Sequence, residues 1–344
     1  MPSTAIDRLR DGYVAGLVSG LSSIRDMVAA GLLRFSLSHS CRLMKQAEPE
    51  IAWRARLAVA PTGGYLAVDF VKLKHEGESI EGVDRQHTHD GIIWGHRFTT
   101  SSLVYPDGTD PYLLRADAAP SQRMATEAYP YLSPAEAMLN VTGDVLVAGY
   151  DLKGVVVDAE FTTKLSLRSL PHFPTGIIGR FRSNTKVHYQ GQTLKAKVLA
   201  EQFPPGRARC YRKLKCYAKR LRVLLPDVGQ LDLIVLWYPY GTGWKLSVLV
   251  STIEAGLQEL IRAFKARWGL EVMHRTLKQN LALTKCQCLS FIAQFKHFDF
   301  CIQALHLIRL ERQRTPGLSW KQAQQQAAHH AKHALLTGPP RKMA

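Results

Sequence analysis

The stretch FKARWGLEVMHRTLK, residues 264–278, is the most informative part of the chain because its side chains sort onto two helical faces. An α-helix turns by about 100° per residue, so steps of three, four and seven return to one face. That face carries an aromatic ring, an arginine, a carboxylate and a lysine: Phe264, Arg267, Glu271 and Lys278. The apolar residues fall on another face: Leu270, Met273, Leu277 and Leu281. A buried face beside a face that mixes an acid with bases suits a metal and phosphate site, although many charged helix faces are simply solvated.

Composition narrows the class of protein. The chain has 344 residues, which favours about two domains, and 46% of them are hydrophobic, as in ordinary globular proteins. Lys and Arg total 45 against 28 acids, a formal net charge of +17. This excess favours a polyanionic partner, most often nucleic acid, over a generally basic protein without that role. The sequence contains neither an apolar run of the ~20 residues a membrane span requires nor an apolar signal-peptide core, so we expect a cytoplasmic protein without membrane contact.

The positive charge is concentrated in one segment. Residues 207–222, RARCYRKLKCYAKRLR, contain eight Lys or Arg with two tyrosines between them. Such a segment can neutralise several phosphates, while its aromatic rings either stack on bases or pack internally. We take Arg212, Lys213 and Lys215 as candidate DNA contacts.

Cysteine and histidine patterns give no clear metal site. The six cysteines include no CxxC pair, so we expect reduced, structural thiols and no zinc site. His87 and His89 with Asp90 lie in an expected loop and are weak evidence for a metal.

Periodicity organises the chain into helices at both ends and strands between them. The pattern predicts helices in residues 1–60 and a break at 61–64. It predicts strands at 65–75, 91–104, 112–116, 145–158 and 176–183. A turn is expected at 105–111 and a helix at 121–140. Residues 186–251 read as an insertion with its own small sheet, followed by one long helix from about 252 to 281 and another from 290 to 314. The remaining tail, 315–344, is polar, and we expect it to fray beyond residue 320. A mixed α/β sheet flanked by helices is the natural fold class.

Three acids stand at positions where chemistry is plausible. Asp69 lies inside the first expected strand, where an unpaired carboxylate costs several kcal/mol. Asp158 ends another strand, and Glu271 lies on the late helix. Each alone fits a turn or an ion pair, but together they suit two Mg²⁺ or Mn²⁺ ions, which prefer oxygen ligands and catalyse phosphoryl transfer as a pair.

These residues resemble a known family. The pattern Phe264-x2-Arg267-x3-Glu271-x6-Lys278, within RWGLEVMHRTLKQNLAL, resembles the Tyr-Arg-Glu-Lys signature of bacterial insertion-sequence DDE transposases. GYLAVDFVKLKHEG is similar to the surroundings of that family's first acid, and VVVDAEFTT with IIGRFRSN to those of its second. The likeness covers roughly residues 60–310. Phe264 departs from it, because the signature has a tyrosine and this ring has no hydroxyl to bond a phosphate.

The resemblance implies a fold and a site. It implies a ribonuclease-H-like catalytic domain over 61–185 and 252–314, the β-rich basic insertion at 186–251, and a helical region at 1–60 that is a candidate for DNA binding. Asp69, Asp158 and Glu271 would be catalytic and would hold two Mg²⁺ or Mn²⁺ ions. The DNA contacts on the helix would be Phe264, Arg267, Arg275 and Lys278. Trp237 or Trp244 of the insertion either handles a flipped base or belongs to the sheet core.

The implied function is that of a DNA transposase, an endonuclease and strand transferase. It would cleave the ends of its insertion sequence and join the 3′-OH to target DNA. Its partners would be double-stranded DNA and a second copy of the chain, with the homodimer formed on DNA near the bacterial nucleoid. Two alternatives remain open: an inactive or domesticated transposase that acts as a DNA-binding protein, and a metal-dependent nuclease without strand transfer.

Overall fold

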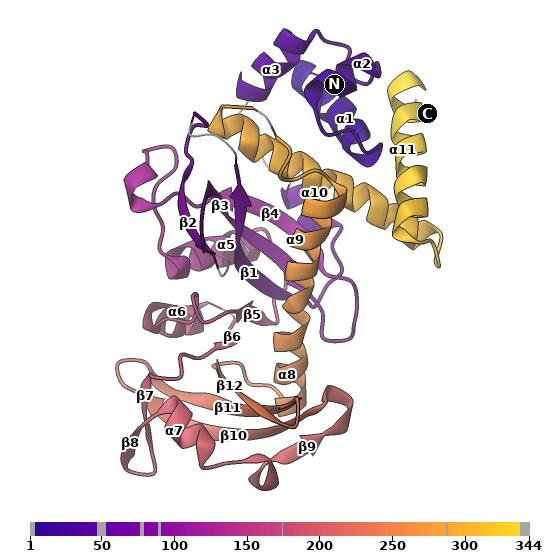
Figure 1. Ribbon diagram of the computed structural model, residues 1–344. Coiled ribbons are helices and arrows are strands. Elements are labelled where there is room, and N and C mark those ends of the chain that lie inside the picture. The colour runs from indigo at the N-terminus through magenta and orange to yellow at the C-terminus, as the bar shows by residue number, and fades with distance from the viewer. Residues whose placement is uncertain are drawn as a thin grey trace.

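The computed structural model describes residues 4–46, 53–75, 79–88, 91–173, 175–286 and 288–337. Within these residues, twelve strands form one mixed sheet flanked by helices, in the order β2-β3-β1-β5-β6-β12-β11-β10-β7-β8, with β4 beside β3 and β9 beside β10 (Figure 1). The predicted mixed α/β class is therefore confirmed. Across the described part of the chain, every helix is too short or too polar to cross a membrane.

The first half of the sheet is built around β1. It pairs antiparallel with β3 and parallel with β5, and β5 continues parallel to β6. The strands of this half are β1 (Tyr65–Lys74), β2 (Asp84–Thr88), β3 (Gly91–Val104), β4 (Tyr112–Ala118), β5 (Gly154–Val157) and β6 (Ile177–Arg180). The strand β2, which holds His87, occupies part of the expected loop, whereas His89 and Asp90 lie outside the described residues.

The insertion is β-rich, as predicted, but it does not form a sheet of its own. Its last strand, β12, pairs antiparallel with β6, so the sheet runs without interruption into the insertion. The expectation of a separate small sheet is wrong because the pairing of β12 with β6 joins segments that are far apart in the sequence, and such a pairing leaves no local sequence pattern. The elements are β7 (Lys186–Tyr189), β8 (Gln192–Lys195), α7 (Ala196–Glu201), η3 (Pro205–Arg207), β9 (Arg209–Tyr211), η4 (Arg212–Leu214), β10 (Cys216–Leu225), β11 (Gly229–Tyr240) and β12 (Gly243–Ser251).

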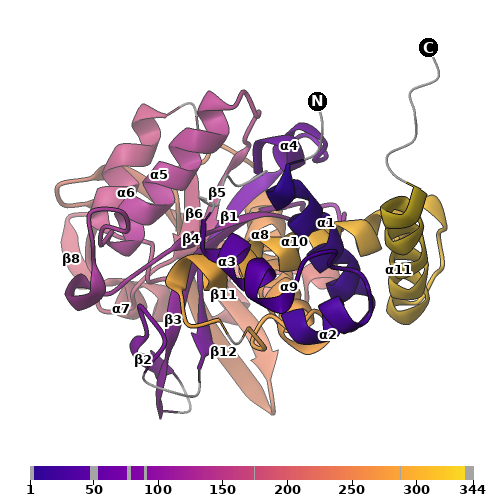
Figure 2. The same cartoon turned by 90° about the horizontal axis from the view of Figure 1, so that it is seen from above.

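Helices cover both faces of the central strands. In Figure 2, α5 and α6 lie on one side of the sheet and α8, α9 and α10 on the other. Each side has its own apolar core, and successive residues of β1 alternate between them. The helices are α5 (Pro134–Val147), α6 (Lys164–Ser169), η2 (Leu170–His172), α8 (Leu257–Ala266), α9 (Trp268–Asn280) and α10 (Phe291–Arg314).

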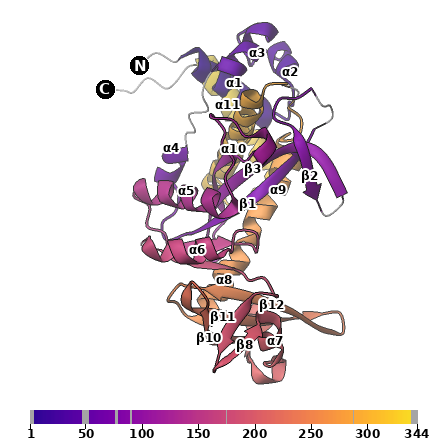
Figure 3. The same ribbon diagram turned by 90° about the vertical axis from the view of Figure 1, so that its left-hand side faces the viewer.

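Helices at the two ends of the chain pack together. The predicted N-terminal helices are present as α1 (Ala5–Val18), α2 (Ile24–Ala29), α3 (Leu37–Gln46) and α4 (Trp53–Ala58). The expectation of a fraying tail is wrong, because Trp320–Thr337 form α11, which packs against α1 and α10 and buries Ala323 and Ala327. In Figure 3 helices α1, α2, α3 and α11 lie at one end of the molecule and the insertion strands at the other, whereas α4 packs against β4.

Three other boundaries differ from expectation. Only η1 (Gln122–Met124) and the start of α5 fall within the predicted helix at 121–140; α5 begins where Ser133 and Glu136 form a capping box. The predicted strand at 145–158 begins as the last turn of α5, which buries Val141 and Val145 at helical spacing. The predicted helix from 252 starts only after Gly256, because β12 extends to Ser251 and Thr252 Oγ1 accepts a hydrogen bond from the Ile177 amide.

Candidate active site

Asp69 points to the face of the sheet that α9 covers. Ala67 and Val71 lie in the core on the α8–α10 side. Asp69 lies midway between them along β1, and because alternate side chains of a strand point to the same face, its side chain points to that side too. Its Oδ1 accepts a hydrogen bond from the backbone N–H of Phe70 at 2.8 Å. The side chain is 22% exposed, so this strand carboxylate is largely withdrawn from water.

Asp158 stands beside Asp69 on the neighbouring strand. Val68 of β1 is paired in parallel with Val157 of β5, and the two acids are the next residues along each strand. Neighbouring strands lie about 4.8 Å apart, so the backbones bring the two carboxylates to one place. Asp158 Oδ1 accepts from the backbone N–H of Ala159 at 2.7 Å, the same arrangement that holds Asp69. Arg180 approaches the same oxygen with its Nε at 3.9 Å.

Glu271 reaches this place from α9 through a shared arginine. Arg267, at the junction of α8 and α9, places Nη1 3.2 Å from Asp69 Oδ2 and Nη2 2.9 Å from Glu271 Oε1. Its backbone stays in the helical region, with φ −51° and ψ −34°, so the predicted face continues through the junction. Arg267 is only 8% exposed, and its Nε is buried without a hydrogen-bond partner among the described residues. The guanidinium thus neutralises two acids while part of it remains unsatisfied.

The electrostatics join all three acids. Burial raises the pKa of Asp69 to about 6, while Arg267 and the Phe70 amide oppose the rise. The negative charges of Asp158 and Glu271 raise this pKa further. One arginine therefore leaves excess negative charge at the site.

The other predicted residues of the helix have separate surroundings. Lys278 Nζ donates a hydrogen bond to the Lys72 carbonyl of β1 at 3.1 Å, and burial lowers the pKa of this lysine. The Phe264 ring lies half-buried, with its centroid 5.9 Å from the guanidinium carbon of Arg267. Arg275 is exposed. The predicted apolar face is confirmed, since all four of its members are buried: Leu270, Met273, Leu277 and Leu281.

Two buried residues beneath Asp69 were missed from the sequence. Thr100 is paired with Asp69 across β1 and β3, and its hydroxyl donates to the Asp69 carbonyl at 3.0 Å. His274 Nε2 lies 2.8 Å from the same hydroxyl, and burial lowers the pKa of this histidine to about 3, which keeps the ring neutral. The signal for His274 is its position three residues after Glu271. Thr100 has no such signal, because strand register is not visible in the sequence.

A glycine lets α9 approach the sheet closely. A Cβ on Gly269 would lie 2.1 Å from Cγ of Pro111, at the end of the predicted turn before β4. Gly269 stands between Arg267 and Glu271 in the sequence, so this close contact fixes the height of both side chains above β1.

The basic segment lies apart from the acids but is linked to them by α8. β10 is five strand positions from β1 in the sheet, about 24 Å at the usual strand spacing. Arg212, Lys213 and Lys215 are exposed at the turn between β9 and β10. Lys265 of α8 donates a hydrogen bond to the Leu214 carbonyl in this turn. The helix pair α8–α9 therefore connects the basic turn with the acids.

The two candidate tryptophans differ. Trp237 packs against a core cluster and its Nε1 donates to the Phe203 carbonyl at 2.8 Å, which fits the sheet-core alternative. Trp244 is 45% exposed at the β11–β12 hairpin and contacts Tyr217 edge to face.

The donor chemistry of the site is carboxylate oxygen only, the kind that Mg²⁺ and Mn²⁺ prefer. In the described part of the chain, no three His, Cys, Asp or Glu side chains are grouped closely enough to hold a metal ion as they stand. Arg267 lies between two of the acids instead. Comparison with known proteins adds no assignment: neither the models of protein families nor the curated proteins give a match to this sequence.

Proposed function

We propose that the chain is a DDE transposase of the Tyr-Arg-Glu-Lys group, which cuts and joins DNA by metal-assisted phosphoryl transfer. The observation that carries the proposal is the meeting of Asp69, Asp158 and Glu271 from β1, the end of β5 and α9. Burial raises the pKa of Asp69, and the charges of Asp158 and Glu271 add to this rise, which supports a site that accepts cations.

The fit of divalent ions rests on the chain's own donors. Asp69, Asp158 and Glu271 would hold two Mg²⁺ or Mn²⁺ ions, since they supply oxygen ligands and more negative charge than Arg267 balances. Bound there, such a pair would activate the attacking oxygen and stabilise the leaving one.

Arg267 has two roles in this proposal. In the chain alone it bridges Asp69 and Glu271 and limits their repulsion. With ions and DNA present, the guanidinium would turn to a phosphate, where a planar fork of donors binds well. The unpartnered Nε is consistent with a side chain that is better satisfied in a second position.

The path of the DNA would follow α8 and α9. Arg275 and Lys278 lie on α9 beyond Glu271, and the turn carrying Arg212, Lys213 and Lys215 is held to the last turn of α8 through Lys265. Cations in both places would neutralise several phosphates along the helix pair. A second copy of the chain would complete the complex, as the family resemblance implies.

The proposed fold is ribonuclease-H-like. Its support is the arrangement of the central strands, in which β1 has an antiparallel neighbour on one side and parallel neighbours β5 and β6 on the other. Asp69 lies on β1 and Asp158 directly follows β5, the strand paired with β1.

The test uses a supercoiled plasmid that carries the genomic DNA flanking the coding sequence. We expect nicking or double-strand cleavage only with Mg²⁺ or Mn²⁺, at the borders of the flanking DNA, followed by joining to a second plasmid. Binding without metal-dependent cleavage would support the domesticated DNA-binding protein. Cleavage of any DNA without joining would support a plain nuclease.

A further inference from the structure

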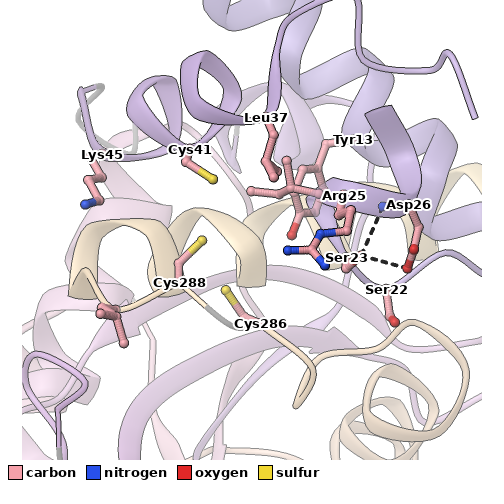
Figure 4. Close-up of a pocket in the computed structure, with 12 residues that line it drawn as sticks. Tyr13, Ser22, Ser23, Arg25, Asp26, Leu37, Cys41, Lys45, Cys286 and Cys288 are labelled. Carbon is pink, nitrogen blue, oxygen red and sulfur yellow. Dashed lines mark hydrogen bonds between the residues drawn. The ribbon is translucent and has the colours of Figure 1, made fainter. Parts of the chain in front are cut away.

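A cavity of about 590 Å³ separates the N-terminal helices from the segment that precedes α10 (Figure 4). Its lining residues come from α1, α2, α3 and the segment before α10, whereas the three acids come from the sheet and α9. Cys41, Cys286 and Cys288 line it together with Lys45 and Arg25. Half of the chain's cysteines thus share one cavity with two cations.

The three thiols belong to two separate segments of the chain. Cys41 lies on α3, one helical turn before Lys45. Cys286 and Cys288 lie before α10, and the side-chain amide of Gln294 donates to both of their carbonyls, at 3.3 and 2.6 Å. Figure 4 shows the sulfur atoms of Cys41 and Cys288 pointing toward each other across the cavity. All three are free thiols; Cys286 is buried, while the other two are partly exposed.

The environment separates one thiol from its neighbours. A hydrogen bond from Cys286 and the charge of Lys45 lower the pKa of Cys288 against its burial. Burial and the nearby Cys288 raise the pKa of Cys41, and Lys45 opposes this rise. Cys288 is partly exposed at the cavity with its sulfur facing Cys41, whereas Cys286 is buried, so this geometry makes Cys288 the nucleophile of the cluster.

We propose that Cys288 and Cys41 form a peroxide-responsive thiol pair, a modification site distinct from the DNA-cutting site. The Cys288 thiolate attacks a hydroperoxide, so that a sulfur–oxygen bond forms, the oxygen–oxygen bond breaks and an alcohol or water leaves after taking up a proton. Cys288 is then a sulfenic acid, oxidised by two electrons. The Cys41 thiol attacks its sulfur, the disulfide forms, and the hydroxyl leaves as water with the thiol's proton.

Cys41 is the resolving partner because it comes from another element. Cys286 is only two residues from Cys288, and a disulfide between them would close a small ring far from preferred disulfide geometry. A Cys41–Cys288 bond would tie α3 to the segment before α10. Oxidation would therefore fix the N-terminal helices against the rest of the fold.

The experiment treats the reduced, full-length chain with increasing hydrogen peroxide, blocks free thiols and maps the products by mass spectrometry without reduction. We expect half-oxidation of Cys288 at a peroxide concentration at least tenfold lower than for Cys210, which is exposed on β9 and serves as the internal control. The main product should be a Cys41–Cys288 linked peptide. Cys41→Ser should shift it to sulfenic and sulfinic acid at Cys288.

Lys45 provides a matched pair of variants. Lys45→Met should slow oxidation of Cys288 several-fold, and Lys45→Arg should restore it, whereas Cys210 should react equally in both. Circular dichroism verifies that each variant is folded. Equal oxidation of Cys210 and Cys288, or a Cys286–Cys288 bond as the main product, would overturn the proposal. Because DNA is absent from the assay, this result is independent of the proposed transposase activity.

Discussion

Two arginines in this molecule each bridge a pair of acids, and the comparison separates a structural cluster from a candidate site. Arg115 of β4 forms ion pairs with Asp117 of the same strand and with Asp144 of α5, each at 2.8 Å. Arg267 binds Asp69 and Glu271 at 3.2 and 2.9 Å. The two guanidinium groups are equally buried, with 10% of each side chain exposed.

The difference lies in what surrounds each bridge. Arg115 lies over the ring of Trp53, 4.9 Å from its centroid, which holds the guanidinium in place. Around Arg267 a third carboxylate, Asp158, adds its charge to that of Asp69 and Glu271, and Arg180 approaches it only to 3.9 Å. An acid–arginine–acid bridge therefore occurs twice in this fold, and the third acid is the feature that distinguishes the candidate site.

The largest expected effect is on DNA cleavage. Asp69→Asn, Asp158→Asn and Glu271→Gln should each lower the rate of metal-dependent plasmid nicking by at least about a thousandfold, roughly 4 kcal/mol, because each removes an ion ligand. Asp144→Asn, which disrupts the other bridge, should stay within a fewfold of the parent chain. Equal losses in all four variants would remove the distinction between the clusters.

Metal ions should change the stability of the Arg267→Ala variant but not that of the Arg115→Ala variant. Arg115→Ala leaves the partly exposed Asp117 and the half-exposed Asp144 without this partner and should cost about 1 kcal/mol in unfolding free energy, with or without Mn²⁺. Arg267→Ala should be destabilising in EDTA, but Mn²⁺ should restore much of the loss by neutralising the same acids. Urea denaturation in both buffers measures this. Rescue of Arg115→Ala by Mn²⁺ would contradict it.

The raised pKa of Asp69 predicts a pH effect with a definite sign. Its folded value of about 6 lies above the ordinary 3.8, so the folded state holds the proton more tightly than the unfolded chain. The stabilisation is complete below about pH 4 and is lost as the pH rises through 6. In EDTA, the parent chain should lose up to about 3 kcal/mol relative to Asp69→Asn between pH 4 and 7. Urea denaturation at each pH measures the difference in unfolding free energy between the two chains. A difference that stays constant from pH 4 to 7 would show that Asp69 is not the titrating group.

The smallest effect should be on DNA affinity. Lys213→Ala with Lys215→Ala should weaken binding to duplex DNA about tenfold at moderate salt and reduce the slope of log K against log salt by about 2. The matched control replaces two exposed lysines of α11, Lys321 and Lys332, with alanine. Similar losses in both double variants would mean that general charge, not the turn before β10, attracts the DNA.

The acid cluster could be anticipated because its signals are local. Asp69 inside an apolar strand and Glu271 four residues after Arg267 each define the face on which their side chains lie. The meeting of Asp69 with Thr100 and His274 could not be anticipated, since it depends on the register of β1 against β3 and the height of α9. The ion pairs of Arg267 with Asp69 and Glu271 were also not predicted, because the sequence suggested only a contact between this arginine and phosphate.

The continuity of the sheet through β6 and β12 has a consequence for how the chain can be altered. Because Arg180 is paired with Leu249 in antiparallel register, everything between them is topologically the loop of a single hairpin. The entropy of closing a loop grows only slowly with its length, so such a cassette can be lengthened, shortened or exchanged while its two ends stay in place. A tight two-residue turn joining the same strands would give a minimal chain that keeps all three acids and lacks the basic turn. The three acids and the basic turn would then lie on separable parts of one sequence.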